Sequence, residues 1–191
     1  LDDKEIEKEK SVIIEEINMY KDIPGQHVHE ILAELMWPDQ PLGLPLAGTV
    51  ESVSALTKAD ITDYKNKFYR PANMLAIAAG RAEEKKMADL CEKYMSIGSE
   101  DKTAHFDKVR LRQKNPRLNL SYKETEQTHV ALGFHAFDRF NAERYVLSIL
   151  NIILGANMSS RLFHILREEM ALWYEISSGV RKYEDTGAFY I

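Results

Sequence analysis

Glu9 and Glu16, near the start of the chain, carry carboxylates, which can bind metal ions, and they are seven residues apart. Seven residues are close to two helical turns, so both side chains would lie on one side of a helix. Ile13 and Tyr20 fall on that side too, which places the acids among core-facing residues. A buried carboxylate is costly unless it is paired or bound to a metal. The spacing leaves two interpretations open: a metal-supporting pair, or two acids at the edge of the apolar stripe that reach water or a cation.

Histidines are the other side chains that could bind a metal, and the chain has six of them. In His27-Val28-His29-Glu30 two histidines stand almost together. Their i, i+2 spacing puts the two rings on different sides of a helix, so we interpret both as surface residues. The other four are His105, His129, His135 and His164, and we assign His129 no catalytic role.

The elements that must position the acidic pair are mostly helices. Pro24-Gly25 ends the first helix, and a Pro- and Gly-rich loop follows the second one. Thr57 and Asp60 are typical of a helix N-cap. The predicted helices cover residues 3–21, 27–36, about 58–68 and about 87–94, the loop covers 37–48, and a buried strand is predicted over 74–79.

Apolar periodicity fails between Ser96 and about Pro116, and we interpret this polar stretch as a linker between two domains. It carries a basic run in which cations follow one another closely. Nucleic-acid binding would call for stacking aromatics between the cations, and the run has none, so we interpret it as a solvated linker or an edge strand. The run consists of Lys108, Arg110, Arg112, Lys114 and Arg117.

Strands and helices alternate again after the linker, which favours an α+β fold. The helix over 142–154 is apolar on nearly every face, so we expect it to be buried. Ser159 can cap a helix that reaches about Met170. The predicted strands cover 118–123, 129–136, 172–176 and 188–191.

Composition excludes several classes of function. The net charge of −5 argues against bulk binding to nucleic acid or to an anionic membrane. Cys91 is the single cysteine, so no internal disulfide forms. No apolar run approaches the roughly 18 residues of a membrane span. The compartment stays open, with a soluble, cytoplasmic protein slightly favoured. The chain begins at Leu1 and stops inside a predicted strand, so we expect an internal fragment.

Four separated stretches, 9–20, 41–53, 69–74 and 155–174, resemble the middle of M16-family zinc metallopeptidases. That family includes pitrilysin, insulin-degrading enzyme (insulinase) and the mitochondrial processing peptidase. The resemblance covers nearly the whole chain. It implies that Glu16 is a metal ligand and that Glu9, one heptad earlier, supports the catalytic site.

The resemblance also implies what this sequence lacks. Family members carry an inverted HxxEH motif upstream of this helix, which supplies two histidine ligands and a glutamate general base. None of the six histidines here lies in such a motif. One carboxylate alone cannot hold zinc at useful affinity. We therefore expect Zn²⁺ in the intact parent protein, none bound by this fragment, and no activity of the fragment alone.

Arg167 and Tyr174 have the seven-residue spacing of an Arg–Tyr pair in the second M16 domain. The resemblance implies that both bind substrate and that Tyr174 stabilises the tetrahedral oxyanion. A guanidinium and a phenol are suitable donors for a developing negative charge. Two other interpretations stay open: Tyr174 as a core residue on a strand face, and Arg167 as a charge that complements the helix dipole. Ala171 stands where many relatives have Gly, which can set a special backbone angle.

Together these features predict an α+β fold made of parts of two M16-type (LuxS/MPP-like) domains, with a mixed sheet packed by helices. Residues 1–112 would hold the end of the first domain plus the linker, and residues 113–191 the start of the second. The predicted function is zinc-dependent hydrolysis of peptide bonds in an enclosed chamber. Its partners would be a peptide substrate and a second half, in a homo- or heterodimer, without nucleic acid or membrane. The alternatives are a non-catalytic M16-like subunit for structure or substrate binding, and an unrelated α+β binding module.

Overall fold

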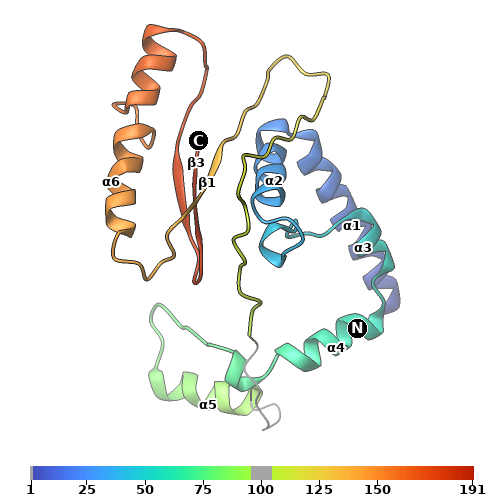
Figure 1. The fold of residues 1–191 in the computed structure, drawn as a ribbon. Coiled ribbons are helices and arrows are strands. Elements are labelled where there is room, and N and C mark those ends of the chain that lie inside the picture. The colour runs from blue at the N-terminus through green and yellow to red at the C-terminus, as the bar shows by residue number, and fades with distance from the viewer. Residues whose placement is uncertain (1, 96–104) are drawn as a thin grey trace. The chain divides into compact units, whose positions relative to one another are not determined.

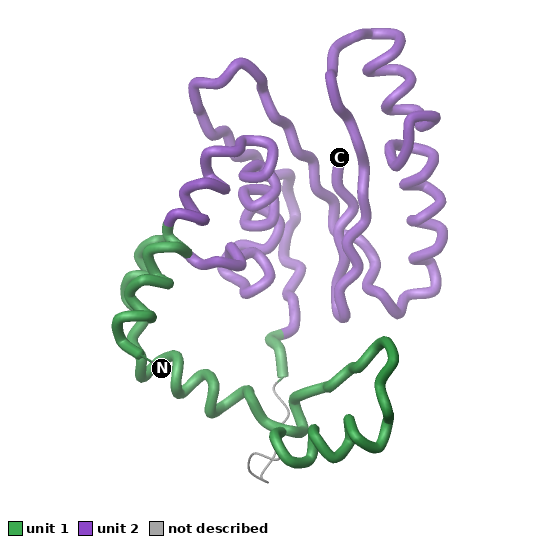
Figure 2. The backbone as a smooth tube through the Cα atoms, turned by 180° about the vertical axis from the view of Figure 1, so that it is seen from behind, with its two compact units in different colours: residues 1–14, 50–107 green, residues 15–49, 108–191 purple. Residues whose placement is uncertain are grey.

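The fold is described here from a computed structural model, which defines residues 2–95 and 105–191 (Figure 1). Within these residues the chain forms an α+β fold, as predicted. It divides into two compact units (Figure 2). Unit 1 comprises residues 1–14 and 50–107, and unit 2 comprises residues 15–49 and 108–191. The part of the predicted linker at 96–104 lies outside the described residues, and the domain boundary at 112 stays a prediction.

Unit 1 is built from helices. They are the first part of α1 (Asp3–Asp22), α3 (Val50–Ala55), α4 (Lys58–Phe68), the short 3-10 helix η2 (Pro71–Asn73) and α5 (Glu84–Met95). The predicted N-cap of α4 is confirmed as a capping box. The hydroxyl of Thr57 accepts the backbone N–H of Asp60 at 3.2 Å, and the Asp60 carboxylate accepts the N–H of Thr57 at 2.8 Å. The Thr57 hydroxyl also donates to the Asp60 carboxylate, and this bond, together with the one from the Thr57 N–H, lowers the pKa of Asp60.

The strand predicted over 74–79 is wrong for the described chain. These residues form neither a helix nor a strand there, and Leu75 and Ile77 are exposed. A strand needs a neighbour to satisfy its backbone groups, and an apolar run alone does not supply one.

Unit 2 combines helices with a small sheet. Its helices are the rest of α1, α2 (Pro24–Met36), the 3-10 helix η1 (Pro41–Gly43), α6 (Arg144–Leu154) and the π-helix η3 (Phe163–Glu169). The strands β1 (Gly133–Ala136), β2 (Gly179–Lys182) and β3 (Gly187–Tyr190) form a three-stranded sheet in the order β1-β3-β2. Both ladders are antiparallel, and Phe189 lies opposite Phe134 on one side and Val180 on the other.

One face of this sheet packs against α2 and the residue after it, Trp37. Met36, Trp37 and Ala188 form the buried cluster, and Val109 and Tyr183 pack against it. Gly133 permits this packing, because a Cβ there would come within 2.5 Å of the Met36 sulfur. Figure 1 shows the sheet between α2 and α6. The core of unit 2 therefore joins residues 24–37 to strands that lie between residues 133 and 190.

The expectation that the helix over 142–154 is buried is wrong. The helix forms as α6, but none of its described residues is fully buried. Only its inner side faces the sheet, where Lys182 of β2 donates to the Ser148 hydroxyl at 2.8 Å. The apolar residues of the outer side are exposed; they are Tyr145, Val146, Ile149, Leu150, Ile152 and Ile153.

Three strand predictions after residue 117 also need correction. Residues 118–123 and 172–176 are extended or bent without a ladder, and the predicted strand at 129–136 shortens to β1. The last predicted strand is confirmed as β3. Across the described residues, no helix combines the length and the apolar character needed to cross a membrane.

Candidate functional site

Glu9 and Glu16 both lie on α1, and both are exposed. The buried side of this helix is marked by Ile17, with Ile13 and Ile14 half-buried. The two acids therefore do not face a core in the described chain, and the interpretation that they reach water holds there. Among the described residues no hydrogen bond or ion pair occupies the Glu16 carboxylate, whereas Glu7 on the same helix accepts from Lys10 at 2.8 Å. The Glu16 carboxylate is thus available to bind a cation in the described chain.

The described residues do not by themselves form a zinc site. No group of three or more His, Cys, Asp and Glu side chains comes together in ranges 2–95 and 105–191. Zinc in proteins takes three or four such ligands, and Glu16 supplies one. The chain therefore offers a single candidate carboxylate to a metal and no complete coordination set within the described part.

His27 and His29 are both partly exposed, and His29 also makes a contact that the surface interpretation did not include. His27 is partly exposed and lies 3.3 Å from the Glu30 carboxylate. His29 instead packs edge-on against the Tyr190 ring at a centroid distance of 5.9 Å. Burial, helped by the nearby Arg181 guanidinium, lowers the pKa of His29. The two rings point to different sides of α2, as the spacing predicts, and one side faces the sheet.

His135 on β1 also lies where the sheet packs against α2 and Trp37. Its ring lies 5.9 Å from the Trp37 ring, and its Nε2 is 3.3 Å from the Gln113 side-chain oxygen. Burial is the main cause of its lowered pKa, and Arg117 adds to it. Both histidines that line the α2–sheet contact are therefore structural in this chain.

Arg167 and Tyr174 lie on the segment that connects α6 to β2. Arg167 is on η3, where its guanidinium lies over the Phe163 ring at 4.7 Å. Tyr174 stands at a bend and is 84% exposed. The interpretation of Tyr174 as a core residue on a strand is therefore wrong in the described chain. Both donors are accessible to a ligand.

Two backbone features shape this segment, and the sequence showed only one of them. Residues 163–169 form a π-helix rather than the α-helix expected there; such wide turns are rare and often occur at functional sites. The turn ends at Ala171, which has a positive φ of 50°. The Leu172 N–H donates to the Leu166 carbonyl at 3.0 Å and closes the turn. The Gly that many relatives have at position 171 was the signal for this conformation, and nothing in the periodicity indicated the π-helix.

The base of this segment is clamped by Ser178, which sequence reasoning missed. The Ser178 N–H donates to the Gly155 carbonyl at 3.0 Å, and its hydroxyl donates to the Asn151 side-chain oxygen at 2.7 Å. Gly155 allows this approach, because a Cβ there would lie 2.6 Å from the Ser178 hydroxyl. The clamp, formed by Asn151, Gly155 and Ser178, fixes both ends of residues 156–177. Arg167 and Tyr174 therefore sit on one closed loop.

Comparison with known proteins places the chain in a family. A family profile described as the peptidase M16 inactive domain matches residues 55–191. An uncharacterized zinc protease of Bacillus subtilis, YmxG, is 33% identical over 97% of this chain and 45% of its own length. One of Streptomyces coelicolor is 33% identical over 99% of this chain and 42% of its own length. The chain thus spans about half the length of the curated relatives it matches.

Solved structures give the same fold. A putative M16-like peptidase from Alicyclobacillus acidocaldarius superimposes with a TM-score of 0.71 at 25% identity, over 100% of this chain and 47% of that one. A protease from Helicobacter pylori reaches a TM-score of 0.78 at 20% identity, over 100% and 47% of the two chains. The fold and the matched residues together define a peptidase-family segment. The chain belongs to the M16 peptidase family.

Proposed function

We propose that this chain is part of a zinc-dependent endopeptidase that hydrolyses peptide bonds of peptides or unfolded segments in an enclosed chamber. The observation that carries the proposal is the alignment of almost the whole chain with relatives named zinc proteases. In the intact protein, residues 1–112 and 113–191 would belong to two successive domains. A second half, identical or different, would complete the chamber around the peptide.

Glu16 is the proposed metal ligand, and its accessibility supports this role. The carboxylate is exposed and takes part in no ion pair within the described chain, so it can bind a cation without breaking a contact. Zinc, when bound, would activate water and polarise the peptide carbonyl. Glu9 is proposed to support the site from one heptad earlier on α1. Because Glu16 is the single candidate ligand in the described chain, the 191-residue polypeptide is expected to be inactive alone.

Arg167 and Tyr174 are the proposed substrate-binding pair. Both are exposed on the loop that Ser178 closes, and neither is used in an ion pair of the described chain. A guanidinium can hold a peptide carbonyl, and a phenol can donate to the oxyanion that develops during hydrolysis. The π-helix and the turn at Ala171 set the direction of this segment, so they would position both donors.

A test of the metal role compares Glu16→Gln with Glu15→Gln in the intact protein that carries this sequence. Glu15 is the adjacent residue of α1 and is equally exposed, which makes it a matched control. We expect Glu16→Gln to lose bound zinc and peptidase activity together, and Glu15→Gln to keep both, because an amide is a poor zinc ligand. Metal content by mass spectrometry and cleavage of a fluorogenic peptide measure the two quantities. Normal zinc content in Glu16→Gln would contradict the role of Glu16 as a metal ligand.

The substrate role is tested by Tyr174→Phe, with Tyr122→Phe as the control. Tyr122 is also an exposed tyrosine of unit 2. Loss of one donor to the oxyanion should lower kcat by about a hundredfold with zinc content retained. The Tyr122 variant should behave as the parent. An unchanged kcat for Tyr174→Phe would contradict the proposed role.

A non-catalytic subunit is the second candidate, and one observation favours it: the profile that matches residues 55–191 describes an inactive domain. A subunit of this kind would act in structure or substrate binding beside an active partner. The intact protein would then neither bind zinc nor cleave peptides, while Arg167 would still be needed for peptide binding.

A further inference from the structure

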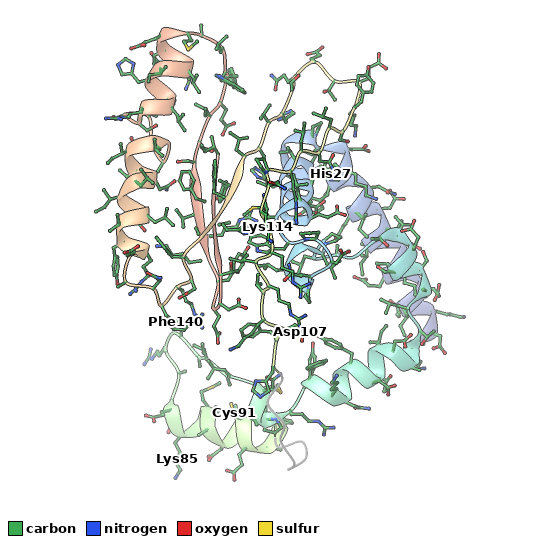
Figure 3. All side chains as sticks on the ribbon, viewed as in Figure 1. His27, Lys85, Cys91, Asp107, Lys114 and Phe140 are labelled. Carbon is green, nitrogen blue, oxygen red and sulfur yellow. The ribbon has the colours of Figure 1, made fainter. Side chains whose placement is uncertain are left out.

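Between residues 108 and 114 every second residue of unit 2 is a cation. Lys108, Arg110, Arg112 and Lys114 are all exposed; Figure 3 labels Lys114 on this extended segment. Among the described residues none of the four takes part in an ion pair, although Lys123 and Arg139 in the same unit do. We call these four residues the basic strip. They lie in a chain whose net charge is −5.

The backbone of this segment is fixed to unit 2 at its first residues. The Val109 N–H donates to the Asp185 carboxylate at 2.6 Å. The side-chain amide of Gln40 accepts the Arg110 N–H at 2.7 Å and donates to the Arg110 carbonyl at 3.3 Å. Gln40 thus contacts Arg110 with the donor and acceptor pattern of a neighbouring strand. The backbone of the strip is therefore held at Val109 and Arg110.

This anchoring determines which side chains point outward. Val109 packs against the buried cluster around Trp37, and Gln113 reaches His135 of β1. Because successive residues of an extended chain alternate between two sides, the four cations face away from the sheet and α2. The alternation stops at Pro116. Beyond it, Arg117 donates to the Leu35 carbonyl at 2.9 Å and is not part of the strip.

We propose that the basic strip binds an extended acidic peptide that carries a carboxylate at every second residue. Cations two residues apart on an extended backbone repeat at roughly 6.6–6.8 Å, and carboxylates on a facing extended peptide repeat at the same distance. Opposite charges directly across two strands stabilise their pairing. No backbone–backbone hydrogen bond involves residues 111–114 in the described chain, so their N–H and C=O groups are free to pair.

A nucleic acid fits this surface less well. Single strands bind to grooves in which bases stack on aromatic side chains, and the residues between the cations are Val109, Leu111 and Gln113. The proposal does not depend on the peptidase function, because it rests on residues 108–114 alone.

The test titrates the 191-residue chain into fluorescein-labelled peptides and follows fluorescence anisotropy. One peptide alternates Glu with Val, and a second has the same composition with its Glu residues in one block. We expect the alternating peptide to bind more tightly and its affinity to fall with added salt. Equal affinity for the two peptides would overturn the proposal, since the spacing of the charges would then not matter.

Replacement of all four cations by Gln should weaken binding of the alternating peptide by about tenfold or more. A control variant replaces four exposed lysines of unit 1 by Gln and should bind as the parent. Those lysines are Lys65, Lys85, Lys86 and Lys93. Circular dichroism checks that both variants fold. An equal loss in the control variant would overturn the proposal, because net charge and not the strip would then determine binding.

A third arm separates peptide from other polyanions. An oligonucleotide and a polyphosphate with the same number of charges are titrated under the same conditions. Weaker binding of both than of the alternating peptide supports the strip as a peptide site. Tighter binding of either one would overturn the choice of a peptide and assign the strip to that polyanion.

Discussion

Unit 2 and unit 1 differ in what holds them together. In the described chain, unit 2 contains the buried cluster around Trp37 and the three-stranded sheet, while Val53 is the buried apolar side chain of unit 1. The helices of unit 1 rely on local devices such as the capping box of Thr57 and Asp60. The candidate residues Glu16, Arg167 and Tyr174 all lie in unit 2, so the difference teaches that the candidate chemistry is exposed on the unit that has the larger core. Arg167 and Tyr174 are on an exposed loop whose clamped base adjoins the best-packed region.

We expect the largest loss of stability from Trp37→Ala in unit 2, which we compare with Val53→Ala in unit 1. Trp37 is 2% exposed and contacts both β1 and the turn before β3, so its truncation should cost about 3–5 kcal/mol. Val53 is 4% exposed in unit 1, and loss of two methyl groups should cost about 1–2 kcal/mol. Urea unfolding followed by circular dichroism measures both. Equal destabilisation would contradict the difference between the units.

The next largest effect is on the pH dependence of folding stability, and we expect it to arise from histidines of unit 2. The pKa values of His29 and His135 are lowered below the ordinary 6.5 in the folded state. As pH falls below about 6.5, the unfolded chain takes up these protons first, so stability present above that pH is lost. We expect the urea concentration at the midpoint of unfolding to decrease as the pH is lowered from about 8 to about 5.

Replacement of both histidines by Gln should flatten that part of the pH profile. Arg181 and Arg117, the cations that oppose protonation, stay in place in this variant. His105→Gln changes an exposed histidine of unit 1 and serves as the control. An unchanged profile in the double variant, measured by Trp fluorescence, would show that the α2–sheet contact does not carry the effect.

The smallest effect is a gain of stability at the turn after η3. Ala171 has a φ of 50°, a conformation in which a Cβ is unfavourable. Ala171→Gly should stabilise the fold by about 0.5–1 kcal/mol, because relief of the left-handed strain exceeds the added entropy of Gly. Asp39→Gly is the matched control at φ 55°, and it should gain less, since Asp tolerates this region better. Thermal unfolding measures the change in stability of both variants, and a loss of stability in Ala171→Gly would contradict the claim that Ala171 is strained.

The sequence predicted the elements whose signals are local. The α1 and α2 helices, the Thr57 cap and the strand β3 all follow from periodicity and capping residues within a few positions. It failed where an element needs a distant neighbour. Residues 74–79 and 118–123 have strand composition and no ladder in the described chain. The packing of His29 was missed for the same reason, since it depends on Tyr190, which lies far along the chain.

For the candidate site, residue types and family spacing named Glu16, Arg167 and Tyr174, and their roles stay predictions. What could not be predicted was their surroundings. The hydrogen bonds of a π-helix span one residue more than those of an α-helix (i→i+5 instead of i→i+4), a change that leaves no periodic signal in seven residues. The clamp of Ser178 to Asn151 and Gly155 joins positions more than twenty residues apart. Its polar side chains are too ordinary for a sequence to single them out.

The clamp has a consequence for how such a loop can change over time. Since both ends of residues 156–177 are tied at one place, insertions or exchanges within them leave the register of β2 against β3 unaltered. We expect the sequence of this loop to tolerate exchange between relatives when Asn151, Gly155 and Ser178 are kept. Recognition could therefore diversify here at little cost to folding.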